Sequence, residues 1–137
     1  MAVLLAGVLI LPTPTEGQTD RTADGFAFLL YVQSLAAQRT ARLCERGEPA
    51  YRQKFDDLYA RWLAKYGGQV ARGEALLRDA LAKRDQPQTD YADLERLENA
   101  AAELRQPPRE TSPVTLDERG KARCEESLRD LAEGLTP

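Results

Sequence analysis

The sequence contains no histidine, and this absence limits the chemistry that the remaining residues could perform. Without an imidazole there is no Ser–His or Cys–His nucleophile pair, and no histidine ligand for zinc or haem. The di-iron pattern of Glu-x-x-His on paired helices is excluded for the same reason. The only cysteines, Cys44 and Cys124, are too few for an all-cysteine zinc or iron–sulfur site. We therefore expect a protein that is not an enzyme and that carries no metal and no cofactor.

Two pairs of adjacent carboxylates, Asp56-Asp57 and Glu125-Glu126, are the remaining candidates for acid–base work. Neighbouring residues on a helix point about 100° apart, so neither pair converges on one atom. An enzyme built on carboxylates or tyrosines alone would need a cleft that raises the pKa of one carboxyl. We expect these four side chains to lie on solvated helix faces.

The two cysteines suggest a covalent link rather than catalysis. An even number of cysteines in an oxidising compartment is normally paired, which predicts a Cys44–Cys124 disulfide. The alternative is two buried thiols that pack as small hydrophobic groups in a cytosolic protein.

The N-terminus favours the oxidising compartment. The run from Ala2 to Leu11 is apolar and has the length of a signal-peptide core, about half of what a membrane-spanning helix needs. Small residues, Thr15 and Gly17, stand at the −3 and −1 positions of a cut after Gly17. Two features disagree, since no basic residue precedes the run and no Ala-x-Ala motif follows it. We predict a signal peptide over residues 1–17, one domain over residues 18–137, and a periplasmic or secreted location. The alternative is an apolar N-terminal strand or helix turn of a cytosolic protein.

The composition and apolar spacing of the rest of the chain predict helices. Alanine, leucine, arginine and glutamate dominate, and no segment alternates apolar and polar residues as a strand would. The apolar spacing predicts helices over about 22–46 and 49–84, a third that begins at Thr89 or Asp90 and stops before Pro107-Pro108, and a fourth that begins at Thr115. The second is one long helix through Gly67-Gly68, with a break there as the alternative. A capping box from Thr115 to Glu118 is expected to start the fourth.

Residues at three-to-four spacing, most of them apolar, define the face that each helix is expected to turn to the core. In the first helix these are Phe26, Leu29, Leu30, Gln33, Ala37, Thr40 and Cys44. In the fourth they are Leu116, Gly120, Cys124, Leu128 and Leu131. Because each cysteine lies on such a face, a disulfide would place the first and fourth helices side by side. The predicted fold is an all-α, four-helix-bundle-like domain with a long central helix and a disulfide between its first and last helices.

An aromatic stripe on the second helix is the strongest candidate for a binding surface. Its members are Tyr51, Phe55, Tyr59, Trp62 and Tyr66. Such a stripe is usually core, but half-exposed Tyr and Trp are also common anchors at protein interfaces. Arg61 and Lys65 would form a charged rim, as part of a basic strip that continues to Arg72 and Arg78. That strip could meet a partner or the acidic C-terminal helices of the same chain.

The net charge of −3 argues against a nucleic-acid partner, because phosphate binding needs clustered Lys and Arg. No run of residues is long and apolar enough for a stable membrane span. We therefore expect an exported, non-enzymatic binding protein whose partner is another protein and whose contact surface is the aromatic stripe. One alternative is a helical bundle that binds a small apolar ligand. The other is a structural periplasmic protein without a ligand site.

Overall fold

The computed structural model describes residues 16–83 and 91–137, and these residues form helices and no strands. The helices are α1 (Glu16–Gly47), α2 (Tyr51–Ala82), α3 (Tyr91–Arg105) and α4 (Glu118–Gly134). The prediction of an all-α fold with four helices is confirmed. The predicted signal peptide lies outside the described residues, except for its last two residues, which begin α1.

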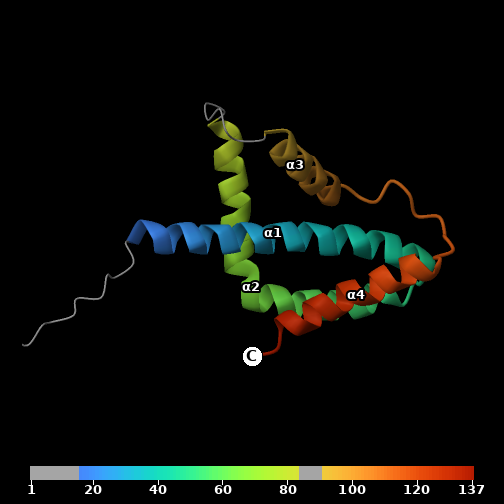
Figure 1. Cartoon of the computed structure of the whole chain (residues 1–137). Coiled ribbons are helices and arrows are strands. Elements are labelled where there is room, and N and C mark those ends of the chain that lie inside the picture. Colours follow the sequence, from blue (N-terminus) through green and yellow to red (C-terminus); the bar gives the residue numbers. More distant parts are fainter. Residues whose placement is uncertain (1–15, 84–90) are drawn as a thin grey trace, which may run out of the picture.

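A tight turn joins α1 to α2 and sends the chain back along α1. The N–H of Tyr51 donates to the carbonyl of Glu48 at 2.9 Å, so Pro49 and Ala50 belong to the turn. The second helix therefore begins at Tyr51 and not at Pro49 as predicted. Its first half lies beneath α1 beside α4, and its second half crosses α1 (Figure 1).

The helix α2 is continuous through Gly67-Gly68, as predicted, and it bends near its middle (Figure 1). Nothing lies within 4 Å of a Cβ placed on either glycine, so no close packing requires these residues to be glycine. Glycine pairs are a common cause of helix bending. The bend lets one helix contribute to both parts of the core.

The crossing of α1 and α2 depends on a different glycine, Gly73. A Cβ at this position would overlap the carbonyl group of Ala27 and the Cβ of Tyr31. The carbonyl group belongs to the backbone of α1 and the Cβ is the first side-chain atom of Tyr31, so neither can rotate away. A larger residue at position 73 would therefore push the two helices apart.

The core has two parts, one on each side of this crossing. The first lies between α1, the first half of α2, and α4; its buried members are Leu30, Ala37, Ala41, Cys44, Tyr51, Phe55, Trp62, Cys124 and Leu131. The second lies between α1, the second half of α2, and α3; its buried members are Tyr31, Leu35, Leu77 and Ala101.

The predicted core face of α1 is only partly buried, which corrects the expectation for its first half. Ala37 and Cys44 are buried, but Phe26 is 49% exposed and Leu29 is 66% exposed. The reason is a difference in length: α1 has 32 residues and α4 has 17, or about 48 Å against about 26 Å. The disulfide aligns the start of α4 with the end of α1, so α4 ends before it reaches Phe26.

The start of α4 also differs from the prediction. The helix begins at Glu118, and its N-cap is Asp117, whose side chain accepts from the N–H of Gly120 at 2.7 Å. The capping box at Thr115 is therefore wrong. Leu116 packs so closely over Gly47 that a Cβ on that glycine would overlap its side chain. With Leu116 held there, the helix has its N-cap at Asp117, two residues later than predicted, and aspartate caps a helix as well as threonine does.

Two arginines on α1 hold the connection between α3 and α4 in place. Arg42 caps the end of α3 by donating to three carbonyl oxygens, those of Glu103, Leu104 and Gln106. One turn later, Arg46 donates to the carbonyl of Ser112 at 2.9 Å, and its own carbonyl accepts from Val114 N–H at 3.0 Å. The segment that crosses back over the bundle is thus fixed at both ends.

Candidate functional site

The five predicted aromatic residues lie along one side of α2, as their spacing predicts, but that side faces the core. Tyr51 and Phe55 are each 2% exposed and Trp62 is 1% exposed. These three side chains are covered by α1 and α4 and offer no surface in this structure. Core packing, the alternative interpretation of the stripe, holds for them. Tyr59 and Tyr66 are half-buried at its edge.

The aromatic rings follow one another along α2, stacked from Tyr51 to Trp62 and tilted by 49° between Trp62 and Tyr66. Neighbouring ring centroids are 6.4, 5.1, 6.0 and 5.2 Å apart from Tyr51 to Tyr66. Aromatic pairs at such separations contribute about 0.5–1.5 kcal/mol each beyond their burial. The rings therefore stiffen the first half of α2 and support α1 and α4 on either side.

Two tyrosine hydroxyls fasten α2 to α4. Tyr51 donates to the carbonyl of Cys124 at 3.0 Å, and Tyr66 donates to the carbonyl of Gly134 at 2.7 Å. Lys65 also donates to the carbonyl of Gly134, at 2.9 Å, and its ammonium lies 5.2 Å from the centre of the Tyr66 ring. A cation that binds the last carbonyls of a helix stabilises its negative end. Lys65 and Tyr66 thus cap α4.

The third hydroxyl, that of Tyr59, belongs to a buried polar network with α1. It is 2.6 Å from the Oγ of Ser34 and accepts from the Nε2 of Gln38 at 2.9 Å. The amide of Gln38 also donates to the Oγ of Ser34 at 3.1 Å. Since Ser34 is buried, this network satisfies polar atoms that would otherwise destabilise the core.

The buried phenols are held in their protonated form. Burial raises the pKa of Tyr59 above its usual 10.0, and its hydrogen bond to Ser34 lowers it only in part. Burial likewise raises the pKa of Tyr51, against the lowering effect of a hydrogen bond to Ser127. These tyrosines are neutral at physiological pH. They act here as hydrogen-bonding groups and not as bases.

The other basic residues of α2 do not meet the acidic C-terminal helices. Arg72 pairs with Asp24 of α1 at 2.8 Å, and Arg78 pairs with Glu74 of its own helix at 2.6 Å. Of the two alternatives for the basic strip, contact with the C-terminal helices is seen for Lys65, the one member of the strip that hydrogen-bonds to α4 within the described residues. Arg61 is exposed and forms none of the ion pairs found in the described part of the chain.

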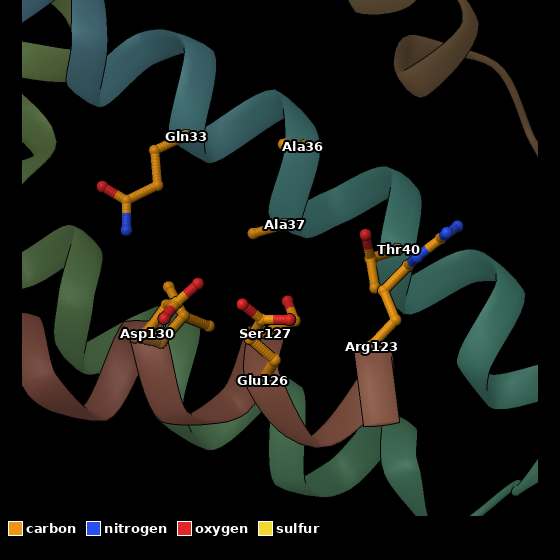
Figure 2. Close-up of a pocket in the computed structure, with 9 residues that line it drawn as sticks. Gln33, Ala36, Ala37, Thr40, Arg123, Glu126, Ser127 and Asp130 are labelled. Carbon is orange, nitrogen blue, oxygen red and sulfur yellow. The ribbon is translucent and has the colours of Figure 1, made fainter. Parts of the chain in front are cut away.

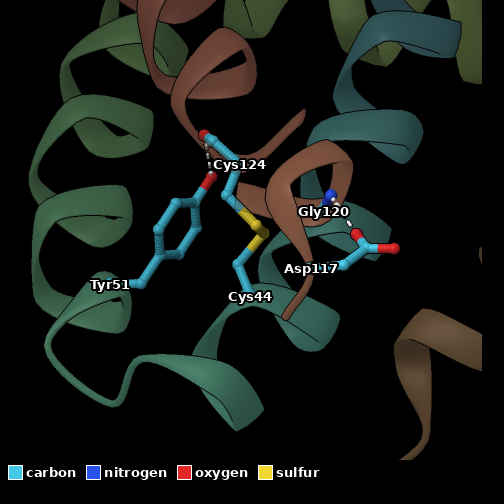
Figure 3. Close-up of a disulfide and its surroundings, with 5 residues drawn as sticks. All are labelled: Cys44, Tyr51, Asp117, Gly120 and Cys124. Atoms are coloured by element: carbon cyan, nitrogen blue, oxygen red, sulfur yellow. Dashed lines mark hydrogen bonds between the residues drawn. A yellow bond between two sulfur atoms is a disulfide. The ribbon is translucent and has the colours of Figure 1, made fainter. Parts of the chain in front are cut away.

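The predicted disulfide is present and joins α1 to α4, with the Cα atoms of Cys44 and Cys124 5.9 Å apart (Figure 3). Both cysteines are buried in the first part of the core. Around them, the hydroxyl of Tyr51 donates to the carbonyl of Cys124, and Asp117 caps α4, the helix that carries Cys124 (Figure 3).

A groove between α1 and α4 is the first surface feature that sequence reasoning missed. Its volume is about 190 Å³, and side chains from both helices point into it (Figure 2). The α1 side supplies Gln33, Ala36, Ala37 and Thr40, and the α4 side supplies Arg123, Glu126, Ser127, Asp130 and Leu131. Phe26 and Leu29 are three residues apart, and Leu29 is four residues before Gln33, so the three residues lie on one face of α1 at helical spacing.

The predicted carboxylate pairs behave as expected. Asp56, Asp57, Glu125 and Glu126 are all exposed, and Asp56 pairs with Arg52 at 3.2 Å. Within residues 16–83 and 91–137, no three potential ligands gather as a metal site would require. In the same ranges, no helix is both long and apolar enough to cross a membrane. Comparison with protein-family models, with curated proteins and with solved structures finds no match to this chain.

Proposed function

We propose that this chain is an exported, non-enzymatic binding protein that docks an amphipathic helix of a protein partner along α1. The docking surface consists of the α1–α4 groove and the α1 ridge, by which we mean Phe26 and Leu29. The aromatic stripe then has a supporting role, because it holds the two walls of the groove in place.

The exposure of the α1 ridge is the observation that carries this proposal. Phe26 and Leu29 are 49% and 66% exposed, and together with Leu43 they are the exposed large hydrophobic residues of the described chain. They precede the groove-lining residues of α1 at helical spacing, on a stretch of the helix that α4 does not cover. An amphipathic partner helix engages such a surface with apolar side chains repeated every three or four residues.

The charges around the groove indicate the chemistry of the partner. Glu126 and Asp130 line its α4 wall together with Arg123, and none of the three forms an ion pair with another described residue. An excess of unpaired carboxylates favours a partner helix that carries basic residues beside its apolar face. The complementary pairs would set the orientation of the helix more than its affinity.

The Cys44–Cys124 bond supports placing this function in the periplasm or outside the cell. Disulfides of this kind form and persist in oxidising compartments and are rare in the reducing cytosol. A bond that fixes α4 against α1 also fixes the width of the groove before a partner arrives, which lowers the entropic cost of binding.

Site-specific photo-crosslinking in the natural host tests the proposal. A photoreactive phenylalanine replaces Phe26 in one variant and Ala36 in a second. The matched control carries it at Ala64, an exposed position on α2 outside the groove. We expect one partner to be captured at positions 26 and 36 and not at 64, with the crosslinked peptide forming a basic amphipathic helix.

Three results would contradict it. Adducts with a second copy of this chain would identify self-association instead. Equal capture at positions 36 and 64 would show non-specific contact. No adduct at positions 26 and 36 would favour a structural protein without a partner on this face.

A further inference from the structure

A second hollow lies on the other side of α4, over the disulfide, and it differs from the groove in shape and lining. Its volume is about 530 Å³, within the range usual for small-molecule sites. It is bounded by the end of α1, the start of α2, the segment before α4, and α4 itself. The disulfide and the ring of Tyr51 form part of its wall, and Val114, Leu116 and Leu128 add aliphatic surface.

The walls of this pocket are fixed without a ligand. The disulfide holds α1 against α4, and Tyr51 binds the carbonyl of Cys124. On the opposite side, Val114 N–H donates to the carbonyl of Arg46, and Leu116 fills the space that Gly47 leaves open. A pocket preformed in this way binds with little loss of conformational entropy.

Two cations and two anions surround the aliphatic surface: Lys54, Lys121, Glu48 and Glu125. Lys54 and Glu48 pair with each other at 3.4 Å. Lys121 and Glu125 are exposed, and neither side chain takes part in an ion pair within the described ranges. The mouth of the pocket therefore offers one free charge of each sign, which suits a ligand that is neutral overall and carries both charges.

The spacing of the free charges sets the size of that ligand. Lys121 and Glu125 are four residues apart on α4, a rise of about 6 Å along the helix axis. An extended dipeptide spans about 7 Å, so its terminal ammonium and carboxylate can face Glu125 and Lys121 at the same time. Its side chains would then enter the aliphatic part of the pocket.

We infer that this pocket binds short zwitterionic peptides with apolar side chains. The site shares α4 with the proposed docking surface but none of its lining residues, so each proposal can fail without the other. Both terminal charges and at least one aliphatic side chain contribute to recognition. Because the ion pairs are exposed to solvent, binding is weak and reversible.

A two-dimensional NMR titration of the oxidised protein with leucyl-leucine tests this inference. We expect saturable shifts confined to residues 44–54 and 114–128. N-acetyl-leucyl-leucine amide, which lacks both charges, should bind about tenfold more weakly, the factor expected from losing two exposed ion pairs.

Charge-removal variants separate the pocket from general surface effects. The Lys121→Gln/Glu125→Gln protein should bind leucyl-leucine about tenfold more weakly and should no longer distinguish it from the capped peptide. The control is Arg129→Gln/Glu133→Gln, which removes the same two charges at the same spacing elsewhere on α4 and should bind normally. Shifts that do not saturate, shifts centred elsewhere, or unchanged binding by the first variant would overturn the inference.

Discussion

Two tyrosines of the core, one buried and one half-buried, provide a direct test of how the core is held together, because one hydroxyl has hydrogen-bond partners and the other has none among the described residues. Tyr59 bonds to Ser34 and Gln38 in the first part of the core. Tyr31 is buried in the second part, and among the described residues its hydroxyl has no hydrogen-bond partner. Replacement of each by phenylalanine removes one oxygen and nothing else, so the two variants can be compared directly.

We expect opposite results from the two substitutions. Tyr59→Phe loses two hydrogen bonds, each with a net worth of about 0.5–1.5 kcal/mol. Ser34 and Gln38 remain bonded to each other, so the expected loss of unfolding free energy is about 1–2 kcal/mol. Tyr31→Phe removes a hydroxyl that was buried without a partner, so it should leave stability unchanged or raise it by up to about 1 kcal/mol.

Urea unfolding of the oxidised protein, followed by far-ultraviolet circular dichroism, measures both changes. The Tyr59→Phe transition should move to lower urea with an unchanged slope, and its Tm should fall by roughly 3–8 °C. A Tyr31→Phe variant that loses as much stability as Tyr59→Phe would refute the assignment of hydrogen bonds in the core.

Three further predictions concern the disulfide, the helix crossing and the buried phenols. Reduction of the Cys44–Cys124 bond, which closes a separation of 80 residues, should lower the unfolding free energy by up to about 4.5 kcal/mol; an unchanged urea midpoint after reduction would show that the bond adds no stability. Gly73→Ala should lower the unfolding free energy by about 1–3 kcal/mol, because the new methyl group overlaps α1. Gly68→Ala adds its methyl group in open space and should raise the unfolding free energy by up to about 1 kcal/mol. Equal changes of Tm in the two variants would contradict the crossing geometry. Because the folded pKa of Tyr51 lies above its usual 10.0, the folded state binds the phenolic proton more tightly, so stability is fully present below pH 10 and falls as the pH rises above it. Tyr51→Phe should flatten this alkaline fall in a pH series of urea midpoints, and an unchanged slope would argue against burial of the phenol.

Local pattern was enough to predict the helices and the disulfide. The three-to-four spacing around Cys44 and Cys124 placed both sulfurs on buried faces, and the structure joins them. The apolar phase carried across Gly67-Gly68 likewise predicted a continuous helix. Such patterns lie within a single helix, so they do not depend on which elements pack against it.

Features that depend on two elements at once could not be predicted in this way. The spacing of Phe26 and Leu29 marks an apolar face, but only the length and position of α4 decide that it stays uncovered. The cap of α4 moved to Asp117 because Leu116 packs on Gly47, a contact between residues far apart in sequence. The pocket over the disulfide is similarly a product of tertiary packing, since four chain segments form it.

The aromatic stripe is a second case in which the sequence pattern could not decide between burial and exposure. Its spacing was consistent with core and with an exposed interface, because periodicity gives the face of a helix and not its neighbours. The covering of Trp62 by α1 and α4 decides between them in this structure. Burial of these rings thus stabilises the fold, and the binding that we propose uses the surfaces around α4 instead.

The central claim is that this chain leaves the reducing cytosol and that its first and last helices are covalently joined. One intact-mass measurement tests both parts, on unreduced protein recovered from the natural host after alkylation of free thiols. We predict a chain that begins after Gly17, is lighter by two hydrogens, and carries no alkyl group. A chain that retains its apolar N-terminus and carries an alkyl group on both Cys44 and Cys124 would contradict the account.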